Sequence, residues 1–443
     1  MTKELRFKNI NKLAIPALIA GIAEPLLSIT DTAIIGNIST NATESLAAVG
    51  IVGAFISMLI WVFGQVRSAI SSIISQYVGA NQLEKVKTLP AQAIAIIILG
   101  SLFVVGISYP FAKEIFEFYN ASDTVLEYCI DYFKIRIFGF PFSLFVFAIF
   151  GVFRGLQNTY YPMIIALTGA VLNIILDIVF VYGIENYLPA MNIKGAAYAS
   201  VIAQVIMAIM ALILLLKKTT ISLNISFKIH KEIPRLLNMI GNLFIRTLAL
   251  NTALYFATSY ATGYGKEYIA AYTIGINIWL LGAFMIDGYS SVGNILSGKF
   301  LGAKDYKSLI KLSAILFKYG LAVGTIMALI GFLFYNSIGL LFTKDIAVLK
   351  HFYAVFWIVL ISQPISAITF IFDGMFKGMG EMKYLRNLLL LATSFVFLPT
   401  LFIFDYYNFK LTAIWIAFTV WILARGLPLV IKFRNKFLPL AKV

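Results

Sequence analysis

Carboxyl and amide side chains lie inside two long apolar stretches of the chain. Glu24 and Asp31 are seven residues apart in one stretch, and Asn173 and Asp177 are four residues apart in another. Both spacings place the two side chains on one face of an α-helix. A carboxyl group in a low-dielectric environment can exchange a proton near neutral pH. The pattern therefore predicts a site that binds protons or cations; the alternative is carboxyls held permanently by structural hydrogen bonds.

Four of the further charged residues that interrupt apolar stretches are candidates for a function, namely Arg67, Arg246, Asp287 and Asp373. A charge at the bilayer centre costs about 2.5–3.5 kcal/mol on insertion scales, so each residue needs a partner or a function. Contact with substrate or gating would be a function, and an ion pair or helix cap is the structural alternative. We treat all four as candidates for a substrate cavity or a gate.

The chain offers little for metal or enzyme chemistry. It has one cysteine and two histidines, and it has no nucleotide-binding motif. We therefore expect no metal site, no cofactor and no enzymatic activity, and an ion gradient as the source of energy. The enzymatic alternative is an intramembrane protease with Asp31 and Asp177 as its catalytic pair.

The elements that position these residues follow from composition. Hydrophobic residues make up 60% of the 443 residues, charged residues make up 12%, and the mean hydropathy is +0.90. A soluble domain cannot bury so much apolar surface, so we predict an all-α integral membrane protein. Apolar runs of about 20 residues predict membrane-spanning helices. Twelve are predicted, at about 13–37, 46–77, 88–112, 124–154, 158–184, 195–217, 234–261, 267–295, 308–335, 346–377, 383–404 and 411–434.

The formal net charge of +15 gives information about the orientation of the chain in the membrane. If both termini are cytoplasmic, most lysines and arginines fall in inside loops, as the positive-inside rule requires. We therefore predict a multi-pass plasma-membrane protein with both termini in the cytoplasm, which in a Gram-negative bacterium is the inner membrane. The lipid bilayer is its surroundings, and nucleic acid is not an expected partner.

An internal repeat divides the chain. A shift of 223 positions aligns Phe133–Gly155 with Phe356–Gly378, including matched proline, serine and glycine positions. Six helices per half make the repeats parallel, which is typical of transporters with a site between the halves. We predict two pseudo-symmetric six-helix bundles, at 1–217 and 234–443, joined by a cytoplasmic linker at 218–233.

Two prolines, Pro16 and Pro25, lie within the first predicted helix. Each removes a backbone hydrogen-bond donor. They predict a bend in this helix, next to its two carboxyl groups.

Six short stretches follow one another along nearly the whole chain, at 23–36 (AEPLLSITDTAIIG), 75–80 (SQYVGA), 153–157 (FRGLQ), 173–177 (NIILD), 195–200 (GAAYAS) and 373–378 (DGMFKG). Their order and spacing resemble the multidrug and toxic compound extrusion (MATE) family, and within it the DinF-type branch. The resemblance implies two six-helix bundles that open alternately to either side and export organic compounds against a cation gradient.

The same resemblance implies roles for particular residues. In similar proteins the first-helix aspartate, here Asp31, is the protonation site, with Asn173 and Asp177 in the same N-terminal cavity. Ser200 matches a position that is often threonine, and Pro16 matches the proline at which the first helix is thought to bend.

Sodium-coupled relatives carry an acidic residue early in the seventh helix. Here Asn242 and Arg246 occupy that region. The resemblance therefore favours protons as the coupling ion over sodium.

The sequence thus predicts a monomeric secondary transporter that exchanges organic solutes for protons. Protonation of Asp31, in a network with Glu24, Asn173 and Asp177, would neutralise the site and favour release of substrate outside. An aromatic content of 15% and 12 methionines suit small cationic or amphipathic substrates. The alternatives are sodium-coupled export and a flippase of the same superfamily for lipid-linked oligosaccharides, whose diphosphate would need a cavity lined with many cations.

Overall fold

The computed structural model describes residues 3–38, 41–224 and 228–442, and only the backbone of Lys3 and of residues 24–29. The described residues are mostly helical, and the β-pairing among them is an isolated bridge between Ile184 and Leu188. Helices suit this composition because a backbone in lipid must satisfy its own hydrogen bonds. The all-α prediction is confirmed.

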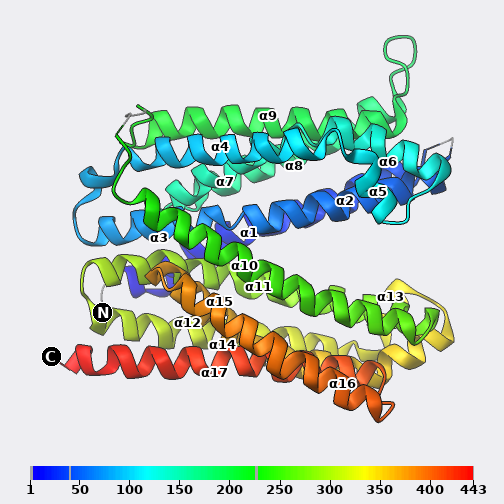
Figure 1. Ribbon diagram of the computed structural model, residues 1–443. Helices are drawn as coiled ribbons and strands as arrows, with labels where there is room; N and C mark the ends of the chain where they lie inside the picture. The colour runs from blue at the N-terminus through cyan, green and yellow to red at the C-terminus, as the bar shows by residue number, and fades with distance from the viewer. Residues whose placement is uncertain (1–2, 39–40, 225–227, 443) are drawn as a thin grey trace. The chain divides into compact units, whose positions relative to one another are not determined.

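Twelve helices or helix pairs occupy the twelve predicted ranges (Figure 1). Within the described residues, nine spans are long and apolar enough to cross a membrane, or ten if the bent pair α6–α7 counts as one. Helices α1 and α10 complete the set. The first six are α1 (Phe7–Ile35), α2 (Ala42–Phe63) with α3 (Val66–Gly79), α4 (Leu89–Ser108), α6 (Asp123–Arg136) with α7 (Gly139–Gly155), α8 (Tyr160–Tyr182) and α9 (Asn192–Lys218). The second six are α10 (Ile233–Gly263), α11 (Lys266–Gly302), α12 (Tyr306–Leu333), α14 (Ile346–Met379), α15 (Met382–Ala392) with α16 (Leu398–Tyr406), and α17 (Leu411–Lys442).

Three of the predicted continuous helices are interrupted. The chain bends by 46° between α6 and α7, and α2 gives way to α3 at Gly64. Between α15 and α16 a π-helical turn, Thr393–Phe397, precedes Pro399. Because proline has no N–H group to donate, the helix widens locally or restarts there. The short helices α5 (Ala112–Phe118) and α13 (Tyr335–Phe342) lie in connecting segments.

The chain forms two compact units, which we call the N-unit and the C-unit. The N-unit is Ile19–Ile74 with Gln82–Ile240, and the C-unit is Met1–Leu18, Ser75–Asn81 and Gly241–Val443. The division of the sequence at 217 and 233 stays a prediction.

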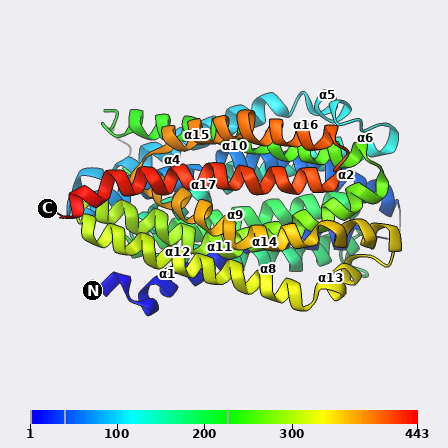
Figure 2. The same ribbon diagram turned by 90° about the horizontal axis from the view of Figure 1, so that it is seen from below.

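Each unit has its own helix packing. In the N-unit, α8 packs on α9, α7 packs on α4 and α9, and α2 packs on α6. In the C-unit, α14 packs against α11, α12 and α17. These helices run along one another in both ribbon views (Figures 1 and 2).

The repeat is visible in individual helix contacts. In the N-unit, a Cβ atom on Gly151 of α7 would lie 2.7 Å from the carbonyl oxygen of Arg67 on α3. In the C-unit, a Cβ atom on Gly374 of α14 would lie 2.2 Å from the carbonyl oxygen of Ser290 on α11. The shift of 223 positions relates both members of these pairs. The repeat therefore preserves a close backbone approach that only glycine allows.

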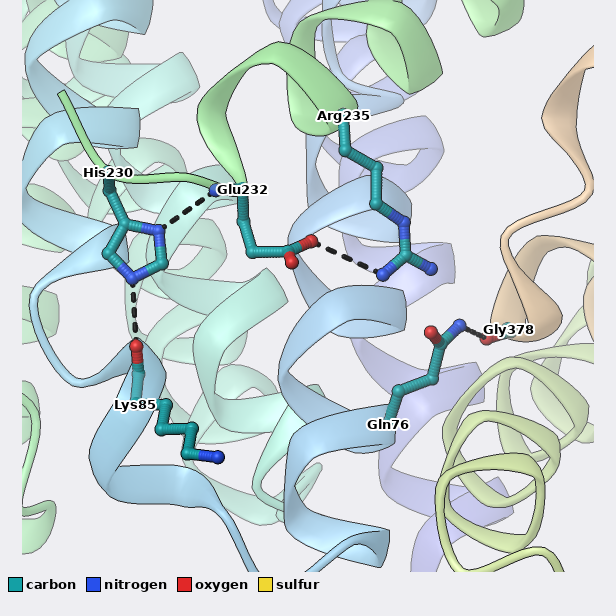
Figure 3. Close-up of polar contacts among 6 residues, drawn as sticks. All are labelled: Gln76, Lys85, His230, Glu232, Arg235 and Gly378. Atoms are coloured by element: carbon teal, nitrogen blue, oxygen red, sulfur yellow. Dashed lines mark hydrogen bonds and ion pairs between the residues drawn. The ribbon is translucent and has the colours of Figure 1, made fainter.

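A second glycine pair lies within the C-unit, where α3 ends beside α11. A Cβ atom on Gly79 would lie 1.9 Å from the carbonyl oxygen of Lys299, and one on Gly302 would lie 1.9 Å from that of Gln76. Gln76 also donates a 2.9 Å hydrogen bond to the carbonyl oxygen of Gly378 (Figure 3). These contacts explain why the end of α3 clusters with the C-unit.

The predicted linker is held against the N-unit by polar contacts (Figure 3). The ring of His230 bonds the backbone oxygen of Lys85 at 2.8 Å and accepts a 3.1 Å bond from the backbone N–H of Glu232. Glu232 in turn pairs with Arg235 at 3.2 Å. Gln92 of α4 donates a 2.7 Å bond to the carbonyl oxygen of Lys228. This connection is therefore fixed at its C-terminal end.

Candidate functional site

The N-unit holds a buried acidic cluster on α1 and α8, formed by Asp31, Asn173 and Asp177. The side-chain amide of Asn173 donates to Oδ1 of Asp31 at 2.9 Å and to Oδ2 of Asp177 at 2.5 Å. Asp31 is 7% exposed, and Asp177 is fully buried. The four-residue spacing predicted that Asn173 and Asp177 share a face, and the structure brings Asp31 to the same point.

Residues of α6 and α9 complete the surroundings of the acidic cluster. Arg136 donates a 3.0 Å hydrogen bond to Gln204 and interacts electrostatically with both carboxyls. Ser200 is buried and lies close enough to stabilise a charge on Asp31, although its hydroxyl does not reach hydrogen-bond geometry. One half-buried cation thus faces two buried carboxyls.

The acidic cluster can hold a proton. The amide of Asn173 donates to one oxygen of each aspartate, so the carboxyls of Asp31 and Asp177 lie close together, and two ionised carboxylates would repel there. Oδ1 of Asp177 is buried and has no hydrogen-bond partner among the described residues. A proton shared by the two carboxyls would relieve the repulsion and satisfy this oxygen.

Three predicted features of α1 have different outcomes. The side chains of Glu24 and Pro25 lie outside the described residues. Pro16 is half-buried, and α1 is helical through it. The bend stays a prediction.

The C-unit holds a second buried cluster, which we call the basic cluster: Arg246, Asp373, Lys377 and Arg425. Arg246 of α10 pairs with Oδ1 of Asp373 at 2.5 Å, and Lys377 pairs with Oδ2 at 2.9 Å, one turn along α14. Arg425 of α17 is 3% exposed and interacts electrostatically with Arg246 and Asp373.

The other two gating candidates lie apart from these ion pairs. Asp287 is exposed on α11 and interacts electrostatically with Lys377. Arg67 is half-buried on α3, and its guanidinium lies 5.4 Å from the ring centroid of Phe147. Their roles stay predictions.

Sequence reasoning missed part of both clusters. Gln204 and Tyr132, which is buried beside Arg136, come from helices remote in sequence and carry no local signal. Lys377 is the last residue of the predicted span 346–377 and was not singled out there. Its four-residue spacing from Asp373 is a helical ion-pair signal that would have found it.

Known proteins match nearly the whole length of the chain. A family model described as MatE matches residues 16–179 and 243–403. The DNA damage-inducible protein F of Escherichia coli (strain K12) is 25% identical over 436 residues, with 97% of this chain and 92% of that protein covered. The multidrug export protein MepA of Staphylococcus aureus is 22% identical over 405 residues, with 90% of this chain and 87% of that protein covered.

A solved structure described as a crystal structure of MATE in the bent conformation has the same fold. Its TM-score is 0.90 at 21% sequence identity, and the match covers 98% of this chain and 96% of that one. This likeness confirms the twelve-helix fold.

Proposed function

The chain belongs to the MatE family of multidrug and toxic compound extrusion transporters, and from this premise we propose that it exports small organic compounds in exchange for protons. It is a multi-pass membrane protein of that family. The observation that carries the proposal is the amide of Asn173, which bridges two buried carboxyls.

The charge of the acidic cluster supports coupling. With one proton shared between Asp31 and Asp177, the remaining negative charge is balanced by Arg136. Loss of that proton leaves an excess negative charge in a low-dielectric site, which attracts a cationic or amphipathic substrate. Return of the proton removes the attraction and weakens substrate binding. Proton and substrate therefore compete, which is sufficient for antiport.

Protons fit this site better than sodium does. Sodium needs several oxygen ligands. The side-chain amide of Asn173 turns its NH2 group, not its oxygen, toward both carboxyls, so it offers sodium no ligand there. In the C-unit, Arg246 already occupies one oxygen of Asp373. We therefore assign proton coupling to the acidic cluster, with no bound cofactor.

The loop charges support the orientation of the chain. We propose that both termini face the cytoplasm and that the protein works as a monomer in the plasma membrane. Transport rather than catalysis is the role of the paired aspartates.

Transport in proteoliposomes tests the proposal. The protein is reconstituted with a fluorescent cationic dye, a pH gradient is imposed, and dye movement is followed with and without sodium. We expect gradient-driven movement in the wild type and at least about a tenfold loss in Asp31→Asn, because the neutral amide cannot exchange a proton. Asp131→Asn is the matched control, since Asp131 forms an exposed pair with Lys194 at 3.0 Å.

Three other outcomes would redirect the assignment. Full retained export in Asp31→Asn would exclude this residue as the proton site. Movement driven by sodium alone would support the sodium alternative. No dye movement by folded wild-type protein would favour the flippase, which lipid-linked substrates would then test.

A further inference from the structure

The charges of the basic cluster do not balance. Arg246, Lys377 and Arg425 surround one buried carboxylate, Asp373. The exposed Asp287 adds a second negative charge near Lys377. Cations still outnumber carboxylates, and buried charge without compensation is costly.

Arg425 is the cation left over. It is 3% exposed, and within the described part of the chain it forms neither a hydrogen bond nor an ion pair. Its guanidinium stacks 4.5 Å from the ring centroid of Trp421. Stacking covers one face of the guanidinium and leaves the N–H donors in its plane unused. Among the described residues, no nitrogen of Arg425 is a fully buried atom without a partner, so these donors remain accessible to an acceptor from outside the chain.

Asp373 does not supply that acceptor. Its two oxygens pair with Arg246 at 2.5 Å and Lys377 at 2.9 Å. Repulsion from Arg246 makes the position of Arg425 less favourable still. A negatively charged group from outside the described chain would supply that acceptor and offset the excess positive charge.

We propose that the basic cluster is a binding site for an oxyanion, a carboxylate or phosphate group, held by Arg425 with the charge of Arg246 nearby. A guanidinium matches the two oxygens of such a group with two parallel hydrogen bonds. The cluster reaches the surface at Lys377, whose side chain is 15% exposed. The site lies in the C-unit and is independent of proton coupling by the acidic cluster.

Direct binding tests the site without transport. The full chain is placed in nanodiscs of phosphatidylcholine and titrated calorimetrically with succinate and with inorganic phosphate at constant ionic strength. We expect saturable binding by the wild type. Arg425→Gln should weaken it at least about tenfold, because charged hydrogen bonds are lost. Arg425→Lys keeps the charge without the planar fork and should lose less.

Controls separate binding from folding. Arg434→Gln changes an exposed arginine of the same helix and should bind like the wild type. Size-exclusion profiles check that the variants fold. If Arg425→Gln does not fold, tryptophan emission of the wild type should still change on addition of succinate, and Trp421→Phe should abolish that change.

The source of the oxyanion is resolved by a lipid arm. In mixed discs with phosphatidylglycerol, enrichment of that lipid around the wild type but not around Arg425→Gln would identify a headgroup phosphate as the ligand. Saturable binding of the soluble probes would identify a free oxyanion. No binding in either arm, or equal binding by Arg425→Gln, would overturn the site.

Discussion

The acidic and basic clusters are both buried among helices, yet they carry opposite charge. The acidic cluster of the N-unit has two carboxyls and one nearby cation, whereas the basic cluster of the C-unit has three cations around one carboxylate. The shift that relates the glycine contacts does not relate the clusters. It aligns Asp31 with Leu254 and Asp373 with Phe150.

The difference separates what builds the fold from what does chemistry. Close glycine contacts recur in both units, such as Gly151 of α7 against α3 and Gly374 of α14 against α11, because both units need the same backbone approach. The buried charges do not recur. The two halves therefore share an architecture while burying clusters of opposite charge.

Removal of the central carboxylate should affect the two clusters very differently. Asp373→Asn leaves Arg246 and Lys377 buried without their counter-charge, and we expect a loss of about 3–5 kcal/mol in unfolding free energy. Asp177→Asn removes one of two adjacent carboxyls and should change stability by about 1 kcal/mol or less. Thermal and denaturant unfolding in detergent measures both. Equal losses would mean that the clusters are not opposite in charge.

The bridging amide gives a second contrast. Asn173→Ala leaves Asp31 and Asp177 without their shared donor, which should cost about 1–3 kcal/mol and abolish pH-driven dye export. Asn251→Ala is the matched control in the C-unit, because Asn251 donates to the backbone oxygen of Thr247 in its own helix at 2.9 Å. We expect about 0.5 kcal/mol or less there. Retained pH-driven export in Asn173→Ala would separate the amide from coupling.

The position of Arg136 can be tested through Gly139. A Cβ atom on Gly139 would lie 1.7 Å from Oε1 of Gln204, the partner of Arg136. Gly139→Ala should therefore cost about 1–3 kcal/mol by overpacking. In a Gln204→Ala background most of that cost should vanish. An unchanged cost would show that the clash involves other atoms.

Hydropathy predicted the twelve spans because each helix must cover the same thickness of lipid. It could not predict the interruptions at Gly64 and before Pro399, since both lie inside runs that remain apolar. Nor did it show that the end of α3 packs on α11, which depends on glycine contacts between distant segments such as Gly79 and Lys299.

The candidate sites were predictable where one helix carries the pattern. Asn173 and Asp177 share a face of α8, so their spacing sufficed. Arg136 reaches the same cluster from α6, and no local pattern shows which face of α6 meets α8. Arg425 was visible only as a charge inside an apolar run; its missing partner required the structure.

A final prediction concerns cations of α17 that do have a partner. Lys436 and Lys432 pair with Glu381 at 2.6 Å and 3.3 Å, between α14 and α15. Burial raises the pKa of Glu381, but the hydrogen bonds and charges of these lysines outweigh it, and the pKa lies below its usual value of 4.5. A carboxyl whose pKa is lower in the folded state stabilises that state above its unfolded pKa, and loses this effect as the pH falls through the folded pKa.

Glu381→Gln should therefore lower the unfolding temperature at pH 7, with an effect of about 1 kcal/mol or less because the pair is partly exposed. The difference from wild type should stay constant down to about pH 5 and then shrink toward zero in acid. High salt should also reduce it. Thermal unfolding across this pH range measures both trends. If the difference in unfolding temperature persists in acid, Glu381 stabilises the fold by packing rather than by its charge. The lysines of α17 would then not be stabilised by charge pairing, and they would no longer contrast with the unpartnered Arg425 on that ground.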